Sequence, residues 1–240
     1  MGETLVLLHG FAGTGRAWDP VVAELDAQRY TALAPDLRGH GSQAGTRPVT
    51  PEAITADVLG AAPPRFALCG YSMGGRIALH VALAAPERVS RLVLVATTAG
   101  IEDADERAAR RAADAQLADA IEAAGLEAFA DRWLAQPLFA RDDAAAQRLA
   151  RADIARNEPA GLAAALRGAG TGAMSPLWDR LGELTMPALV LAGERDAKFT
   201  ALAERLSAAI PDAELALIPG AGHALPRTAP AALARAISAR

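Results

Sequence analysis

The segment that most restricts how this chain can fold is residues 70–74, Gly-Tyr-Ser-Met-Gly, which match a Gly-x-Ser-x-Gly motif. The apolar residues 65–69 before it predict a buried strand, and residues 75–84 after it predict a helix. Between a strand and a helix this motif forms a sharp turn that presents a nucleophilic serine, here Ser72. Because the motif is short, a glycine-rich turn without catalytic function is the alternative, and further parts of a catalytic site are needed.

A serine hydroxyl becomes reactive when a histidine accepts its proton and an acid orients that histidine. Asp196 follows the apolar residues 188–192, and His223 follows the apolar residues 215–218. We therefore predict that Ser72, Asp196 and His223 lie at three strand ends and form a catalytic triad. Glu194 is the competing candidate for the acid.

The first predicted strand ends at His9-Gly10-Phe11 and leads into a loop that contains two glycines. In a serine-elbow enzyme the oxyanion hole uses one amide from such a loop and the amide after the nucleophile. We predict the backbone N–H groups of Phe11 and Met73 for this role. A merely flexible connection is the alternative, and a dinucleotide-binding loop is disfavoured because its third glycine is missing. The histidines other than His223 are interpreted as structural: His9, His40 and His80.

Composition excludes several classes of function. The chain has 240 residues, 52% of them hydrophobic, and a formal charge of only -4, so we expect no nucleic-acid partner and no charged membrane surface. The single cysteine excludes an internal disulfide. No apolar run reaches the roughly 20 residues of a membrane span, and no signal region is recognisable, so we expect a cytoplasmic protein. We expect no cofactor and no metal.

Short apolar segments alternate with amphipathic ones, a pattern typical of an α/β fold with a mainly parallel sheet flanked by helices. The predicted strands cover residues 5–9, 31–34, 66–69, 92–95, 188–192 and 214–218. Residues 102–166 are rich in helix-forming residues and contain no convincing strand. We therefore predict a core formed by residues 1–98 and 186–240, with a helical cap inserted as residues 99–185.

Longer motifs carry a more specific resemblance. They are GYSMGGR at residues 70–76, ERAAR at 106–110, WLAQPLF at 133–139, LRGAGTG at 166–172 and GERDAKF at 193–199. Together they resemble the 2-succinyl-6-hydroxy-2,4-cyclohexadiene-1-carboxylate synthases of menaquinone biosynthesis, which have an α/β-hydrolase fold and act as cofactor-free lyases that eliminate pyruvate. The resemblance implies a multiply anionic small-molecule substrate and a set of substrate-binding residues: Tyr71, Arg76, Arg110, Trp133, Arg156 and Lys198.

Two departures from the family pattern affect the substrate rather than the triad. Residues 97–101 and 224–227 differ from the expected sequences after the fourth strand and after the histidine. A serine carboxylesterase or thioesterase with the same triad therefore remains the alternative, and a binding protein without catalytic activity is a third reading. The arginines distinguish these classes, because a pocket for a neutral ester or thioester has little use for several guanidinium groups.

Overall fold

Six parallel strands form one sheet in the part of the chain that the computed structural model describes, residues 2–140 and 142–239. The order across the sheet is β2-β1-β3-β4-β5-β6. The bounds of the strands are β1 Glu3–Leu8, β2 Tyr30–Leu33, β3 Phe66–Tyr71, β4 Val89–Val95, β5 Ala188–Gly193 and β6 Ala213–Ile218. These strands confirm the predicted α/β fold with a parallel sheet.

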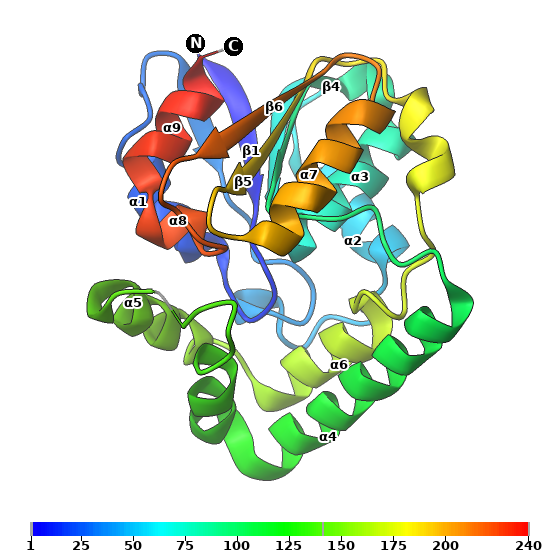
Figure 1. Cartoon of the computed structure of the whole chain (residues 1–240), viewed down its shortest axis with the longest axis vertical. Coiled ribbons are helices and arrows are strands. Elements are labelled where there is room, and N and C mark those ends of the chain that lie inside the picture. Colours follow the sequence, from blue (N-terminus) through cyan, green and yellow to red (C-terminus); the bar gives the residue numbers. More distant parts are fainter. Residues whose placement is uncertain (1, 141, 240) are drawn as a thin grey trace.

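Helices cover both faces of the sheet, as Figure 1 shows. Alternation along β1 explains this: Leu5 and Leu7 belong to one hydrophobic core, whereas Val6 and Leu8 belong to the core on the opposite face. One face packs against α2 (Pro51–Ala61), α3 (Met73–Ala84) and α7 (Ala197–Ala209). The other packs against α1 (Asp19–Val22), α8 (Leu225–Thr228) and α9 (Pro230–Ser238).

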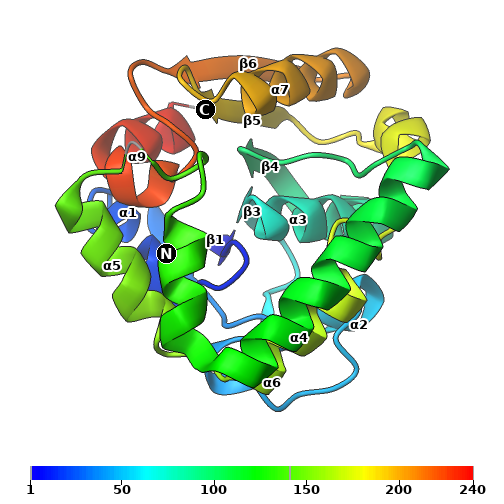
Figure 2. The same ribbon diagram turned by 60° about the horizontal axis from the view of Figure 1, so that its bottom comes forward.

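A helical insertion connects β4 to β5 and consists of α4 (Ala104–Leu134), α5 (Ala144–Ile154) and α6 (Pro159–Ala169). Figure 2 shows these helices arranged as an arch beside the core. The long α4 contains a kink at Gly125, where φ is 79° and ψ is 179°. A glycine adopts that conformation without steric cost, so the chain changes direction there while both halves stay helical.

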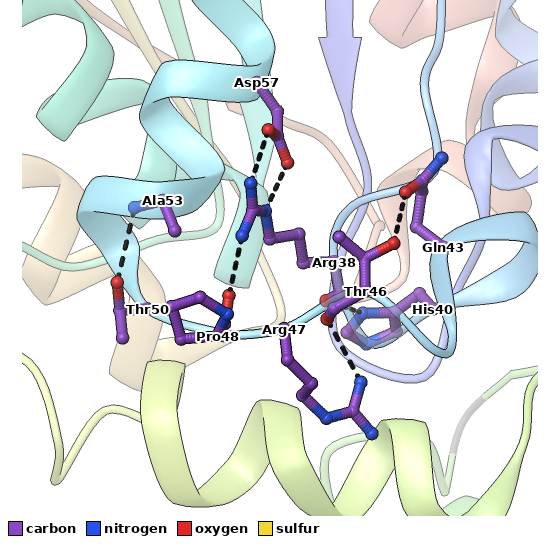
Figure 3. A network of polar contacts seen from close by, with 9 residues as sticks. All are labelled: Arg38, His40, Gln43, Thr46, Arg47, Pro48, Thr50, Ala53 and Asp57. Atoms are coloured by element: carbon purple, nitrogen blue, oxygen red, sulfur yellow. Dashed lines mark hydrogen bonds and ion pairs between the residues drawn. The ribbon is translucent and has the colours of Figure 1, made fainter.

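The loop that follows β2 holds α6 against the core. In Figure 3, Arg38 forms an ion pair with Asp57 of α2 and donates to the carbonyl of Pro48. Arg47, drawn beside the light-green helix, donates through Nη2 to the carbonyl of Ala160 at 3.0 Å. The backbone of Gly161 lies so close to this loop that a Cβ there would come within 2.5 Å of a carbonyl oxygen. The cap is therefore docked by backbone contacts as well as side chains.

Gly74 allows α3 to lie directly against β1, and this contact generates our first prediction. A Cβ added at Gly74 would lie 2.1 Å from the carbonyl oxygen of Leu8, whereas one added at Gly60 near the end of α2 would meet no atom within 4 Å. Gly74→Ala should lower the free energy of unfolding by about 1–3 kcal/mol or prevent folding, because backbone must move. Gly60→Ala is the matched control and should stabilise the protein by about 0.5–1 kcal/mol. Thermal unfolding of both variants measures this, and equal melting temperatures would contradict the close approach.

Candidate active site

The backbone of Ser72 is held in a strained conformation between β3 and α3, with φ 52° and ψ -111°. Its N–H donates to the carbonyl of Val95 at 2.9 Å. Its carbonyl accepts hydrogen bonds from the N–H of Gly75 and from the hydroxyl of Thr97, the latter at 2.7 Å. Thr97, one of the departures from the family sequence pattern, therefore supports the turn that presents Ser72.

Ser72, His223 and Asp196 come together at the ends of β3, β6 and β5. The Nδ1 atom of His223 lies 2.8 Å from Oδ2 of Asp196, and its Nε2 atom lies 3.4 Å from Oγ of Ser72. Both His223 and Asp196 are buried. The serine–histidine distance is at the long end of the range for a hydrogen bond, and such catalytic contacts shorten in complexes with substrate.

Asp196 is fixed by its place at the start of α7. Its Oδ1 atom accepts a hydrogen bond from the N–H of Phe199 at 3.3 Å, so the side chain caps the helix while Oδ2 faces His223. Glu194 is exposed and instead accepts a hydrogen bond from the N–H of Gly220 at 2.8 Å. Of these two acids, only Asp196 contacts the histidine.

Aromatic rings enclose the histidine. The ring centroids of Phe199, Tyr71 and Phe139 lie 4.4, 5.4 and 6.0 Å from that of His223. Burial raises the pKa of the Tyr71 phenol, so this ring stays neutral at physiological pH. The histidine and its acid thus lie in a largely apolar shell, where their mutual interaction is little screened by water.

The predicted oxyanion loop is a tight turn in which the N–H of Gly13 donates to the carbonyl of Gly10. Phe11 lies at the tip of this turn and lines the same cavity as Ser72. Met73 is the first residue of α3, so its N–H has no acceptor within the helix. Both residues line the cavity, and the role of their amides in an oxyanion hole stays a prediction.

Two buried side chains of the cap hold that loop. Asp153 of α5 accepts hydrogen bonds from the N–H and the hydroxyl of Thr14. Asn157, just beyond α5, donates to the carbonyl of Ala12 at 3.1 Å and accepts from the N–H of Gly41 at 3.0 Å. The position of the cap and the shape of the oxyanion loop are therefore coupled, which the sequence alone did not reveal.

A cavity of about 590 Å³ opens between the cap and the triad. Its walls include Ser72, His223 and two residues predicted to bind substrate, Tyr71 and Trp133. Basic side chains predominate over acidic ones around it: Arg76, Arg110, Arg132, Lys198 and Arg227 against Asp114 and Asp153. The size suits a small molecule, and the excess of positive charge suits an anionic one.

Arg76 and Arg110 lie at the end of the cavity formed by α3 and α4. Arg76 is buried and donates through Nη1 to the carbonyl of Ala169 at 3.0 Å, and Nη1 also contacts the sulfur of Met174. Arg110 donates through Nε to Oδ1 of the buried Asp114 at 2.8 Å. Burial, together with the nearby charge of Arg110, lowers the pKa of Arg76 to about 10, which still leaves it protonated at neutral pH.

The placement of Arg156 differs from the prediction. It is exposed in the turn after α5 and is not among the residues that line the cavity. Its neighbours Asp153, Ile154 and Asn157 face inward, so the side chain between them faces solvent. Lys198, which was predicted to bind substrate, lines the cavity. Arg227 also lines it, although it was not among the residues predicted to bind substrate.

Two of the three histidines interpreted as structural, His9 and His40, support the loop that follows β1. His9 is buried, and its Nε2 atom accepts a hydrogen bond from the N–H of Leu37 at 3.0 Å. His40 packs edge-on against both His9 and Phe11, with ring centroids 5.0 and 5.7 Å apart. Burial, together with His9, lowers the pKa of His40 to about 3. Both rings act as neutral packing groups behind the oxyanion loop.

The described residues contain no group of three or more His, Cys, Asp or Glu side chains arranged to hold a metal ion. Within residues 2–140 and 142–239, no helix combines the length and the apolar character needed to cross a membrane. Cys69 is a free, buried thiol in β3, in keeping with the packing role expected for it.

Comparison with known proteins assigns the chain to a family. Residues 5–236 match the alpha/beta hydrolase family. A 2-succinyl-6-hydroxy-2,4-cyclohexadiene-1-carboxylate synthase from Klebsiella pneumoniae is 35% identical over 238 residues, which are 95% of this chain and 90% of the relative. The solved structure of MenH from S. aureus has a TM-score of 0.91 and 32% identity over 99% of this chain and 92% of that one.

The chain belongs to this synthase family within the α/β-hydrolase superfamily. The resemblance deduced from the motifs is thus confirmed. An esterase from Thermogutta terrifontis, solved with malate bound, is also similar, with a TM-score of 0.84 and 27% identity over 100% of this chain and 89% of that one. The chain is therefore an α/β-hydrolase-family enzyme related to the synthases, while its relatives include a hydrolase on the same fold.

The triad geometry predicts that its members act as one unit. Ser72→Ala and His223→Ala should each reduce kcat by on the order of 10⁴–10⁶-fold, and the double variant should lose little more. Asp196→Asn should cost a comparable or smaller factor through a mis-oriented imidazole, whereas Glu194→Gln serves as the control. Steady-state kinetics of these five variants measures this. Losses that multiply in the double variant would show that Ser72 and His223 act independently.

A second prediction concerns pH and stability. The folded-state pKa of His40, about 3, lies below its ordinary value of 6.5, so between these values only the unfolded chain binds the proton. The stability that comes from keeping the His40 ring neutral is therefore fully present above pH 6.5. It is lost as the pH falls from 6.5 toward 3, because proton binding then favours the unfolded chain. Between pH 7.5 and 5.5 it should lower the free energy of unfolding by about 1.4 kcal/mol. Urea unfolding should show a flatter pH dependence for His40→Gln; an unchanged slope would contradict the assignment.

Proposed function

We propose that this enzyme is a cofactor-free lyase that eliminates pyruvate from a multiply carboxylated cyclohexene precursor and forms 2-succinyl-6-hydroxy-2,4-cyclohexadiene-1-carboxylate, the step its relatives perform in menaquinone biosynthesis. One observation carries the proposal: Ser72 and His223, the latter held by Asp196, line a cavity whose wall is rich in arginine. Membership in the synthase family supports it.

In the proposed reaction, Ser72 removes a proton from the carbon next to a substrate carbonyl and passes it to His223. The electron pair of that C–H bond moves onto the carbonyl oxygen, where the amides of Phe11 and Met73 stabilise the enolate. As this pair returns, it forms a new double bond in the ring, the double bond already present shifts by one position, and the C–O bond to the enolpyruvyl group breaks. That group leaves as an enolate, takes the proton from His223 and tautomerises to pyruvate. No redox cofactor or metal takes part in this balance.

Charge complementarity supports an anionic substrate. The acidic residues of the cavity wall already have partners, since Asp114 binds Arg110 and Asp153 binds Thr14. The basic side chains of the wall outnumber the acidic ones, so the cavity keeps a net positive charge. Guanidinium groups bind carboxylates through paired hydrogen bonds, which also fix orientation.

Ester or thioester hydrolysis is the second candidate, favoured by the similarity to an esterase of the same fold. Attack on a carbonyl and proton abstraction beside one both build negative charge on oxygen, so the same triad and amides serve either reaction. The difference lies in what the cavity binds, because a neutral ester offers nothing with which an arginine can pair.

The direct experiment mixes the purified protein with the carboxylated precursor and follows pyruvate through lactate dehydrogenase and NADH. We expect turnover that depends on Ser72. p-Nitrophenyl acetate, assayed in parallel, should be hydrolysed slowly or not at all. Efficient ester hydrolysis without pyruvate release would favour the esterase alternative and refute the lyase proposal.

The arginines provide a second test. Arg76→Ala or Arg110→Ala leaves a substrate carboxylate without its partner, a loss of roughly 2–5 kcal/mol by analogy with buried charge pairs. We expect kcat/KM on the precursor to fall at least tenfold, and more than it falls on the neutral ester. Arg148, exposed on α5, supplies the control Arg148→Ala. Equal losses on both substrates, accompanied by a lower melting temperature, would show that the arginines only support the cap.

A further inference from the structure

Arg227 lines the same cavity as Arg76 and Arg110 but comes from α8, whereas Arg76 comes from α3 and Arg110 from α4. Arg227 belongs to the short α8, four residues beyond His223, and α8 packs against the face of the sheet that does not carry α3 (Figure 1). Its side chain is only 13% exposed. The guanidinium carbon lies 5.8 Å from the ring centroid of Phe139, and that ring is 6.0 Å from the ring of His223. A buried cation therefore lies close to the triad.

The counterion of Arg227 is poorly matched to it. The nearest carboxylate is Asp142, in the loop between α4 and α5, whose side chain is 5% exposed. Its Oδ2 atom lies 3.7 Å from Nη2 of Arg227, which is beyond hydrogen-bond distance. Nε of Arg227 and Oδ2 of Asp142 are both buried without a hydrogen-bond partner among the described residues. Burial raises the pKa of the Asp142 carboxyl despite the opposing influence of Arg227 and His223.

A buried ion pair with these unsatisfied atoms destabilises the folded protein unless another group supplies the missing hydrogen bonds. A buried polar group without a hydrogen-bond partner destabilises the folded state, and a charged one does so more strongly. Arg76 and Arg110, in contrast, each donate a hydrogen bond at 3.0 Å or less to a protein oxygen. Arg227 is linked to the histidine through the ring of Phe139, and its Nε donor has no hydrogen-bond partner among the described residues. A planar carboxylate supplies the two acceptor oxygens that such a group can bind at once.

We propose that Arg227 binds a carboxylate of the substrate at the triad end of the cavity, and that Asp142 is the counterion it exchanges for that carboxylate. This inference rests on the proposed function, since it assumes a substrate with several carboxylates. It gives the substrate a second point of attachment, separated by the reacting centre from Arg76 and Arg110. Two separated anchors fix the orientation of the ring between them, which is what a reaction at one particular C–H bond requires.

The test measures binding without turnover. In a Ser72→Ala background, the dissociation constant of the carboxylated precursor is determined by titration calorimetry with and without Arg227→Gln. We expect the variant to bind at least tenfold more weakly, with Arg227→Lys intermediate because an ammonium lacks the planar two-point contact. Arg235, exposed on α9, gives the matched control Arg235→Gln, which should bind as the parent does. Equal binding by Arg227→Gln would overturn the inference.

A second variant separates substrate binding from support of Asp142. If Arg227 only neutralised Asp142, removing both charges with Arg227→Gln and Asp142→Asn would restore parental affinity, and that result would also overturn the inference. We expect the double variant to stay at least tenfold weaker, and Asp142→Asn alone to bind at least as tightly as the parent. The double variant also keeps the test valid should Arg227→Gln alone fold poorly. Absence of precursor binding by the Ser72→Ala parent would refute the proposed function instead.

Discussion

The backbone of Ser72 is the constraint on which the rest of the site depends. A non-glycine residue at φ 52° and ψ -111° persists only where its surroundings over-determine it. Here the carbonyl of Leu8 and the backbone around Gly70 and Gly74 leave no room for a relaxed turn, and Thr97 holds the serine carbonyl. Because β3 ends in this turn, the hydroxyl projects beyond the edge of the sheet, where only loops and the cap can reach it.

That position explains why residues far apart in the chain form one site. In a parallel sheet the loops after successive strands emerge at the same edge, so β5 and β6 deliver Asp196 and His223 beside the serine. The cap adds a further link, since Asp153 and Asn157 bind the loop that contains Phe11. The oxyanion loop is thus held from the core by packing and from the cap by hydrogen bonds. Movement of α5 would necessarily alter the oxyanion loop.

Much of this arrangement follows from local sequence. The predicted strands at residues 66–69, 188–192 and 214–218 are followed by Ser72, Asp196 and His223, and both the parallel sheet and the helical insertion are visible in the alternation of apolar segments. Orientation within the cap was not predictable, because no local pattern shows which side of a turn faces a distant loop. Arg156 therefore proved to be exposed. The ion pair between Arg110 and Asp114 could have been predicted, because residues four apart on a helix lie side by side. The approach of Asp142 to Arg227 could not, because it depends on tertiary packing.

Specificity in such a site depends on how the cations are held when no substrate is bound. Leaving a guanidinium buried without any partner would cost several kcal/mol, whereas pairing it too well would make substrate carboxylates poor competitors. The described residues show intermediate arrangements: Arg110 uses only Nε on Asp114, Arg76 uses only Nη1 on a carbonyl and a sulfur, and Arg227 lies 3.7 Å from Asp142. Each partner occupies part of a guanidinium that has five donors. In the proposed function, the donors that remain on these guanidinium groups would bind the substrate carboxylates and so distinguish an anionic substrate from a neutral ester.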